Sequence, residues 1–332
     1  MAMPALALSE EPVYFADPNL QAAVEKALGV SEPNATDMLG LTDLKANKKG
    51  IVDLTGLEYA TNLMELELNN NKIIDISTFF ELTNLRDLDL SYNKISDISA
   101  LSGLMNLARL NIRSNSVSDI SVLSGLTNLT ALRLSKNQIS DCNAISALTN
   151  LNNLNLGYNK ITDISVVSGL RNLTELSLYN NPISDISAIS GLTNLTRLYL
   201  RRNKVSDISA LSDLTNLRSL IVVYNQVSNI SAVSGLTNLT GLWLYGNDIN
   251  DISGLRELTN LRDLYVGENQ ISNISALSNL TNLTGLCLRE NQISDISALR
   301  GLTNLRCLYL ASNQISDISA LLDLTNLTDL RT

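Results

Sequence analysis

Leucine, isoleucine and asparagine recur along the chain with one fixed period of 22 residues. From Leu63 onward, twelve copies of the pattern L-x-x-L-x-L-x-x-N follow one another without a gap. A degenerate copy precedes them, with Lys49 in place of the asparagine, and a shortened copy with Leu327 and Leu330 ends the chain. Self-similarity at such a period is typical of a repeat protein in which each copy forms one structural unit.

Each part of the repeat predicts a local structure. The x-L-x-L-x segment alternates with a period of two, which predicts a strand whose leucines point inward and whose x residues point outward. The following segment, typified by I-S-D-I-S-A-L-S-G-L, is too short for a full helix and has turn-forming Asp and Ser, so we predict a 3₁₀ turn. The predicted fold is an α/β leucine-rich-repeat solenoid, curved, with a parallel sheet on its concave face and turns on its convex face.

Two polar positions of the repeat are given structural roles. The turn acids, such as Asp75 and Asp97, are interpreted as backbone caps, since one carboxylate per coil cannot supply the six or more oxygens of a calcium site. The asparagine after each strand is predicted to bond backbone groups of neighbouring coils. This predicted ladder consists of Asn71, Asn93, Asn115, Asn137, Asn159, Asn181, Asn203, Asn225, Asn247, Asn269, Asn291 and Asn313.

The first 40 residues do not follow the repeat. Asp17 is placed to cap a helix, Pro18 to begin it and Gly29 to end it. The apolar side of this helix would cover the open end of the first coil, as a solenoid requires. We therefore expect a tail or signal remnant at 1–13, where Ala5-Leu6-Ala7 matches an A-x-A cleavage pattern, a helical N-terminal cap at 14–40, and a repeat array of about 13 copies and a shortened last one at 41–332.

The chain resembles the internalin-type repeat proteins of bacterial surfaces. The resemblance rests on the F-x-D-x-x-L opening at Phe15, Asp17 and Leu20, on the helical cap, and on repeats such as LTNLTELSLYNNPISDISAISG, and it covers nearly the whole chain. It implies a secreted or surface-displayed protein that recognises a host or neighbouring macromolecule on its concave face. The chain departs from the family at Lys49, and at Thr332 it ends in mid-repeat without a C-terminal cap. We expect a monomer that can associate end to end through that uncapped end.

Composition excludes several classes of function. The chain has no histidine, which removes histidine-based catalysis and histidine metal ligands, and we predict no cofactor and no metal. Its net charge of −9 disfavours nucleic acid as a partner. No apolar run approaches the roughly 20 residues that a membrane span needs. The cysteines are expected to be free thiols, because Cys287 and Cys307 face the same side of adjacent strands but are offset by two residues.

Aromatic residues gather at the outward positions of the strands. Eight of the ten tyrosines and the only tryptophan, Trp243, fall there. The strand preference of these residues explains part of this, but not their clustering on five consecutive strands, a patch about 20 Å long. Such an exposed patch typically marks a binding site, and Trp243 should be open to solvent. The predicted ligand-binding residues are Tyr179, Tyr199, Arg201, Arg202, Ile221, Val223, Tyr224, Trp243, Tyr245, Tyr265 and Arg289.

Charge on the same face is divided into zones. Solvated scatter explains most surface charge, whereas functional zones would fix the register of a partner. The residues concerned are the acidic Glu65, Glu67, Asp87 and Asp89, followed by the basic Arg109, Arg113, Arg133 and Lys136.

Three classes of function remain. The favoured one is a non-enzymatic module that binds a protein on the concave face, because aromatic residues and arginine are enriched in protein interfaces. The alternative is a glycan-binding surface that uses the same aromatic patch, which a deep local pocket would favour over a flat one. An enzyme is disfavoured, since the carboxylates Glu65 and Glu67 would lie on an open sheet with no cleft.

Overall fold

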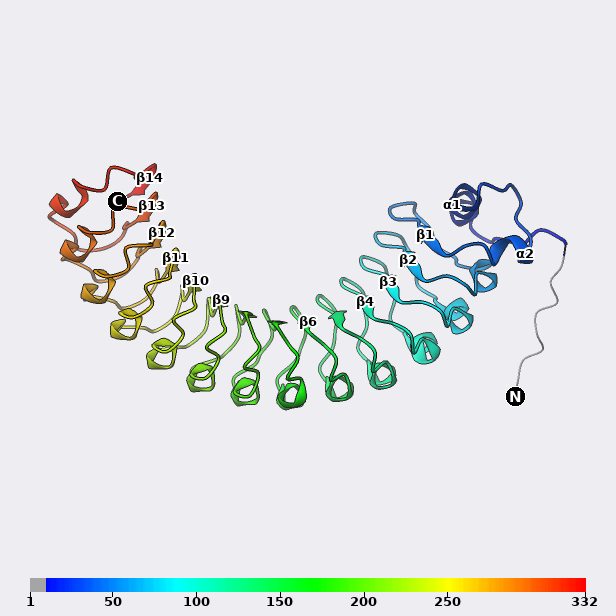
Figure 1. The fold of residues 1–332 in the computed structure, drawn as a ribbon, viewed down its shortest axis with the longest axis horizontal. Coiled ribbons are helices and arrows are strands. Elements are labelled where there is room, and N and C mark those ends of the chain that lie inside the picture. Colours follow the sequence, from blue (N-terminus) through cyan, green and yellow to red (C-terminus); the bar gives the residue numbers. More distant parts are fainter. Residues whose placement is uncertain (1–9) are drawn as a thin grey trace. The chain divides into compact units, whose positions relative to one another are not determined.

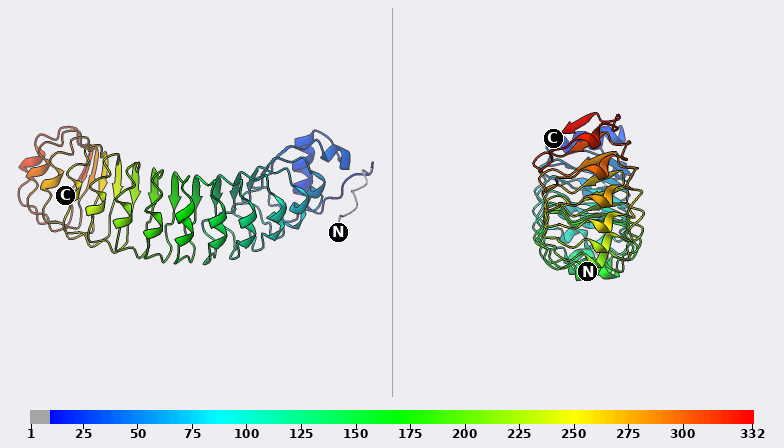
Figure 2. Two further views of the ribbon diagram at one scale, coloured as in Figure 1. Left: turned by 60° about the horizontal axis from the view of Figure 1, so that its bottom comes forward. Right: turned by 90° about the vertical axis from the view of Figure 1, so that its left-hand side faces the viewer.

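The computed structural model describes residues 10–332, which form two compact units, one that ends at Asn159 and one of Lys160–Thr332. The A-x-A pattern at residues 5–7 and most of the predicted tail lie outside the described residues. Each unit is a stack of coils in which the strands line one side and the turns line the other (Figures 1 and 2). The predicted solenoid of parallel strands and 3₁₀ turns is confirmed.

The first unit begins with two helices. Helix α1 (Pro18–Leu28) starts after Asp17, whose side chain accepts hydrogen bonds from the backbone N–H groups of Asn19 and Leu20, and it ends at Gly29 with a φ of 70°. The predicted cap residues are therefore confirmed. Asp17 also accepts the N–H of Val52 at 2.7 Å, which ties the helix to the first coil.

Burial acts to raise the pKa of Asp17, but the backbone donors outweigh it and the pKa lies below its ordinary value. Helix α2 (Ala35–Met38) follows and is capped by Asn34, whose own N–H donates to Asp37 in return.

Parallel strands of three residues each follow, paired in chain order within each unit. The first unit contains β1 (Asp43–Lys45), β2 (Glu65–Glu67), β3 (Asp87–Asp89), β4 (Arg109–Asn111), β5 (Ala131–Arg133) and β6 (Asn153–Asn155). The second contains β7 (Glu175–Ser177), β8 (Arg197–Tyr199), β9 (Ser219–Ile221), β10 (Gly241–Trp243), β11 (Asp263–Tyr265), β12 (Gly285–Cys287), β13 (Cys307–Tyr309) and β14 (Asp329–Arg331).

A 3₁₀ helix on the opposite side of nearly every coil returns the chain to the sheet. In the first unit these are η1 (Leu57–Tyr59), η2 (Ser77–Glu81), η3 (Ser99–Gly103), η4 (Ser121–Gly125) and η5 (Asn143–Ala147). In the second they are η6 (Ser165–Gly169), η7 (Ser187–Ile189), η8 (Ser209–Leu211), η9 (Ser231–Val233), η10 (Ser253–Leu255), η11 (Ser275–Leu277), η12 (Ser297–Leu299) and η13 (Ser319–Leu321).

The side chains of each coil separate by position. Inward residues such as Leu242 and Leu244 are fully buried, so aliphatic side chains fill the stack. The turn acids cap the backbone as predicted. Asp97 accepts the N–H of Ser99 at 2.8 Å, and this bond is the main reason that the pKa of Asp97 is lowered.

The asparagine after each strand links the backbone of its own coil to that of the coil before it. The Oδ1 atom of Asn137 accepts the N–H of Val117 at 3.0 Å, and its Nδ2 atom donates to the carbonyls of Ile112 and Leu134 at 3.0 and 2.9 Å. Such bonds satisfy backbone groups that the coil would otherwise bury without a partner.

Lys49 replaces the asparagine where the first coil meets the helical cap. Ladder asparagines donate to a carbonyl 25 residues earlier, as Asn71 does to Ala46. For Lys49 that earlier residue is Val24, which belongs to α1 rather than to a coil. The backbone N–H of Lys49 still donates to Asn71, at 2.9 Å. The first coil therefore needs no asparagine of its own.

A second asparagine ladder, which the sequence analysis missed, runs along the other end of the strands. It uses the asparagine of the L-T-N-L segment, whose side-chain N–H donates to the carbonyl 23 residues earlier at 2.8 to 2.9 Å. The 22-residue recurrence of this asparagine was the available signal. The residues are Asn62, Asn84, Asn106, Asn128, Asn150, Asn194, Asn216, Asn238, Asn260, Asn282, Asn304 and Asn326.

The residue before each ladder asparagine adopts a left-handed backbone conformation. Its φ lies between 47° and 58° where it is not glycine, and Gly246 takes this position with a φ of 68°. Only glycine occupies this region without a steric cost, and asparagine does so more readily than most residues. The non-glycine residues at this position are Lys48, Asn70, Tyr92, Ser114, Lys136, Tyr158, Asn180, Arg202, Tyr224, Glu268, Glu290 and Ser312.

Within residues 10–332 the three cysteines form no disulfide bond, as predicted. Pairing of β12 with β13 sets Cys287 opposite Tyr309 and Cys307 opposite Gly285. The two cysteines therefore lie on adjacent strands with the predicted offset of two residues.

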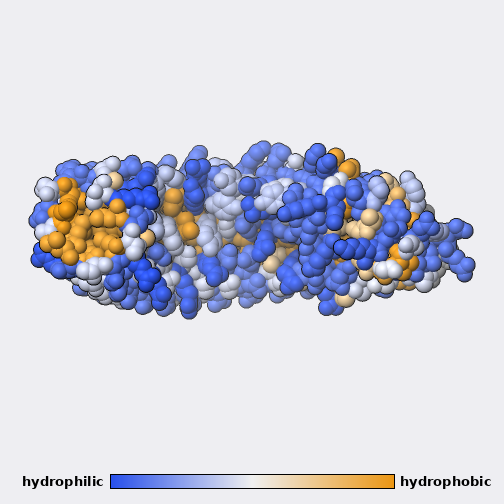
Figure 3. Space-filling view, turned by 90° about the horizontal axis from the view of Figure 1, so that it is seen from above, coloured by the Kyte–Doolittle hydropathy of each residue, from blue (hydrophilic) through white to orange (hydrophobic). Residues whose placement is uncertain are grey.

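The last coil exposes apolar side chains. Leu322, Ile318 and Leu330 are 80%, 59% and 46% exposed, whereas Ile252 and Leu242, the equivalents of Ile318 and Leu330 in the middle of the second unit, are buried. The orange area at the left of Figure 3 lies at this end of the unit.

The two ladders should differ in energetic weight. Asn137→Ala removes three bonds of a partly buried side chain and should lower the free energy of unfolding by about 1–3 kcal/mol. Asn128→Ala removes one bond of an exposed side chain and should cost no more than about 1 kcal/mol. Denaturant unfolding of both variants measures the difference, and equal losses would contradict the assignment.

Candidate functional site

Strand register brings the predicted aromatic residues together on the outer face of the second unit. Tyr199, Ile221, Trp243 and Tyr265 are direct neighbours on β8 to β11. Tyr179, which follows β7, and Tyr199 are half-buried on one side of this group. The central group is called the aromatic platform below and consists of Ile221, Val223, Tyr224, Trp243, Tyr245 and Tyr265.

Trp243 is more covered than the sequence predicted. Its indole lies over Gly241 of its own strand, where an added Cβ would come within 2.3 Å of the ring. The indole also forms a stacked pair with Tyr265, with ring centroids 6.1 Å apart and planes at 18°. Trp243 is therefore half-buried rather than open to solvent, because a glycine and a neighbouring ring hold it flat against the sheet.

Glycines also seat the tyrosines of the platform. The ring of Tyr224 lies over Gly246, and the ring of Tyr245 lies over Gly267 of the next coil. These two rings meet edge to face, with centroids 5.5 Å apart. Glycines at outward positions of the same strands were the sequence signal for these ring positions, and this signal was missed. The platform is thus a set of interlocked rings, a pre-organised surface.

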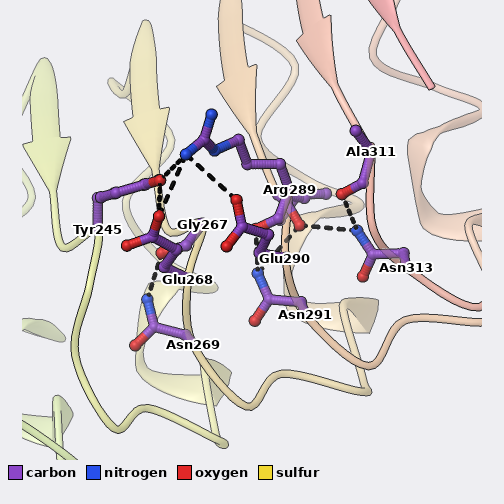
Figure 4. A network of polar contacts seen from close by, with 10 residues as sticks. Tyr245, Gly267, Glu268, Asn269, Arg289, Glu290, Asn291, Ala311 and Asn313 are labelled. Carbon is purple, nitrogen blue, oxygen red and sulfur yellow. Dashed lines mark hydrogen bonds and ion pairs between the residues drawn. The ribbon is translucent and has the colours of Figure 1, made fainter.

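A polar network borders the platform on the β12 side (Figure 4). The hydroxyl of Tyr245 donates to Glu268 and accepts from Arg289, and the guanidinium of Arg289 lies 5.0 Å from the ring centroid of Tyr245. Arg289 also forms ion pairs with Glu268 and Glu290 at 3.1 and 3.2 Å. Burial, followed by the bond to Glu268, raises the pKa of the Tyr245 hydroxyl far above its ordinary value, so Tyr245 stays neutral.

Arginines border the opposite side. Arg197 pairs with Glu175 at 3.4 Å. Arg201 and Arg202 lie 6.0 and 5.6 Å from the ring centroid of Tyr224, and neither has an ion pair within residues 10–332.

Asp263 is the platform's unpaired carboxylate. It lies opposite Gly241 and two residues before Tyr265, and its Oδ1 atom occupies the space that the absent side chain of Gly285 leaves open. Burial raises its pKa, and the nearby Arg262 offsets this only in part.

A separate hollow lies on the outer face of the first unit, over β2 to β5, and its lining includes the charged residues Glu65, Glu67, Asp87, Asp89, Arg109 and Arg133. Asp87 is bonded to Arg109, and the hydrogen bond from Lys45 is the main reason that the pKa of Glu67 is lowered. A general acid needs a raised pKa, so the lowered pKa of Glu67 does not favour that role for this residue. No group of three or more potential metal ligands occurs in the described part of the chain.

The repeats match known families. Overlapping segments between residues 127 and 323 match the family described as Leucine Rich repeats, and residues 61–117 match Leucine rich repeat. Together with the fold, these matches define a leucine-rich-repeat protein, a class whose structures support a role in protein interaction. No curated protein matches the chain.

Solved structures narrow the class. An internalin (InlF) from Listeria monocytogenes is 36% identical, with 98% of each chain covered and a TM-score of 0.95. The chain therefore belongs to the internalin family. Internalin C2 from the same organism is 34% identical over 67% of this chain and 100% of its own, with a TM-score of 0.62. A leucine-rich-repeat protein from Leptospira interrogans, at 24% identity, covering 90% of this chain and 85% of its own with a TM-score of 0.79, shares the fold.

The seat of Trp243 can be tested through its fluorescence, since the chain has one tryptophan. Gly241→Ala should push the indole off the sheet, shift its emission to the red and make it easier to quench, with little change in thermal midpoint. Gly191→Ala is the control, because nothing lies within 4 Å of the added methyl group. Unchanged emission in Gly241→Ala would show that the indole lies elsewhere.

The environment of Asp263 predicts a pH-dependent stability. Because burial raises its pKa, the ionised carboxylate destabilises the folded state above that raised pKa, and the cost disappears below the ordinary value of 3.8. Asp263→Asn should therefore raise the thermal midpoint near neutral pH and have no such effect in acid. Thermal unfolding across this range measures the difference, and a midpoint lowered at neutral pH would contradict it.

Proposed function

We propose that the aromatic platform is the binding site for a protein partner and that the chain is a non-enzymatic recognition module. The observation that carries the proposal is the set of interlocked rings on the outer face of β9 to β11, held in place by glycines. Rings fixed before binding lose little conformational freedom on association. Aromatic residues and arginine also dominate the binding energy of protein interfaces.

The predicted ligand-binding residues fit this use in different ways. Trp243 is central, with Ile221 on one side and Tyr265 on the other. Tyr179, Tyr199, Arg201, Arg202 and Arg289 surround the platform, and they would exclude water and orient the partner rather than supply most of the affinity.

We further propose that the protein acts outside a bacterial cell, secreted or at the cell surface, in adhesion to a host or a neighbouring cell. Membership of the internalin family supports this proposal. No helix between residues 10 and 332 is both long and apolar enough to cross a membrane.

Substitution of Trp243 tests the proposal. Trp243→Ala should weaken partner binding by about 2 kcal/mol or more, because central aromatic residues carry a large share of interface energy. Thermal stability should change little, since the indole is not part of the leucine core. Wild type and variant would be compared as baits for surface extracts of candidate host or neighbouring cells, with and without deglycosylation.

Tyr92→Ala in the first unit is the matched control, because it removes an exposed aromatic residue away from the platform. A partner retained equally by wild type and Trp243→Ala would place the binding site elsewhere.

A further inference from the structure

The charged residues around the aromatic platform are basic on one side and acidic on the other. Arg197, Arg201 and Arg202 all belong to the coil of β8, on one side of the platform. Only Arg197 is paired with a carboxylate. The β8 side is therefore a basic end with two unpaired guanidinium groups.

The opposite side is acidic. Asp263 lies on β11, and Glu268 and Glu290 follow β11 and β12. Arg289 and Arg262 are the cations among them. Arg289 is shared by Glu268 and Glu290, and Arg262 lies near Asp263. Asp263 has neither an ion pair nor a side-chain hydrogen bond within the described residues. This acidic end lies three to four strand steps from the basic end, about 14 to 19 Å away at the usual strand spacing.

Three of these charged residues occupy the same position of the repeat. Arg202, Glu268 and Glu290 occupy the left-handed position of the turn, with φ of 54°, 47° and 53°. Glycine or asparagine would fill this position at lower cost, as Gly246 and Asn180 do in neighbouring coils. Lysine, serine and tyrosine occupy the same position in other coils, so the turn accepts many side chains, charged ones included.

We infer that the partner is a protein segment of complementary polarity, with acidic side chains facing β8 and basic side chains facing β11 and β12 around an apolar centre. The inference rests on the proposed function of the platform and adds the orientation and chemistry of the partner. Charge complementarity of this kind fixes register and speeds association.

The acidic end selects a protein over a glycan. A neutral sugar has no charge for either end, and an anionic polysaccharide would be attracted by Arg201 and Arg202 but repelled by Asp263, Glu268 and Glu290. A polypeptide carries cations and anions together with apolar side chains. Two groups about 14 to 19 Å apart are separated by roughly four to six residues of extended chain.

The repeat supplies matched variants for a test. Arg202→Glu and Glu290→Arg each introduce a residue type that another coil already carries at the same left-handed position. Both should therefore fold. Lys136→Glu makes the same change of charge at the same position in the first unit, away from the platform, and is the control.

The probes are peptides selected from a displayed library of random 12-residue sequences on the wild-type chain, with counter-selection on Trp243→Ala. Dextran sulfate serves as a polyanion probe. We expect peptides in which acidic and basic residues flank an apolar stretch. Arg202→Glu and Glu290→Arg should each weaken their binding by about tenfold at low salt and less at high salt, while Lys136→Glu should not. The double variant Arg202→Glu/Glu290→Arg should prefer the same peptide with its acidic and basic residues exchanged.

Other outcomes distinguish the inferred polarity of the partner from the proposed function of the platform. Peptides that depend on Trp243 but bind every charge variant equally would overturn the polarity and leave the proposed function standing. A third outcome would be that the selected peptides are uniformly acidic and that dextran sulfate binding is weakened by Arg202→Glu and strengthened by Glu290→Arg. That result would show that the partner is a polyanion rather than a protein segment of mixed charge. Failure to select any peptide that depends on Trp243 would overturn the proposed function and this inference together.

Discussion

The hydrogen bonds of the asparagine after each strand are the constraint on which the rest of the structure depends. The chain leaves each strand through a left-handed turn. This turn leaves backbone N–H and C=O groups inside the stack without backbone partners. One amide side chain satisfies groups in its own coil and in the coil before it, as Asn137 does. The coil can then be short and repeat without change, and the leucines inside it remain shielded from water.

Because the backbone and the asparagine side chains satisfy one another's hydrogen bonds, the outward side chains are not needed to stabilise the coils. That freedom explains how one face can carry interlocked aromatic rings between a basic and an acidic end. It also explains why costly residues are tolerated at the left-handed position. Tyr224 and Arg202 have a positive φ there, and the ladder on the next residue holds the turn in place whichever side chain precedes it.

The platform depends on absent side chains as much as on present ones. Gly241, Gly246 and Gly267 leave room for the rings of Trp243, Tyr224 and Tyr245 to lie against the backbone. Those rings lose exposure and mobility before any partner arrives. A surface prepared in this way suits recognition, because less order has to be imposed on binding.

The sequence by itself determined the period, the inward and outward positions and the helix boundaries at Asp17 and Gly29, because each follows from local chemistry repeated at a fixed spacing. It also indicated which strands carry the aromatic residues. Only the tertiary structure decided how those side chains lie. Trp243 stacks on Tyr265, 22 residues away, and Tyr245 meets Arg289, 44 residues away. Such contacts depend on the rotamers that neighbouring coils permit, and period and composition do not specify those rotamers.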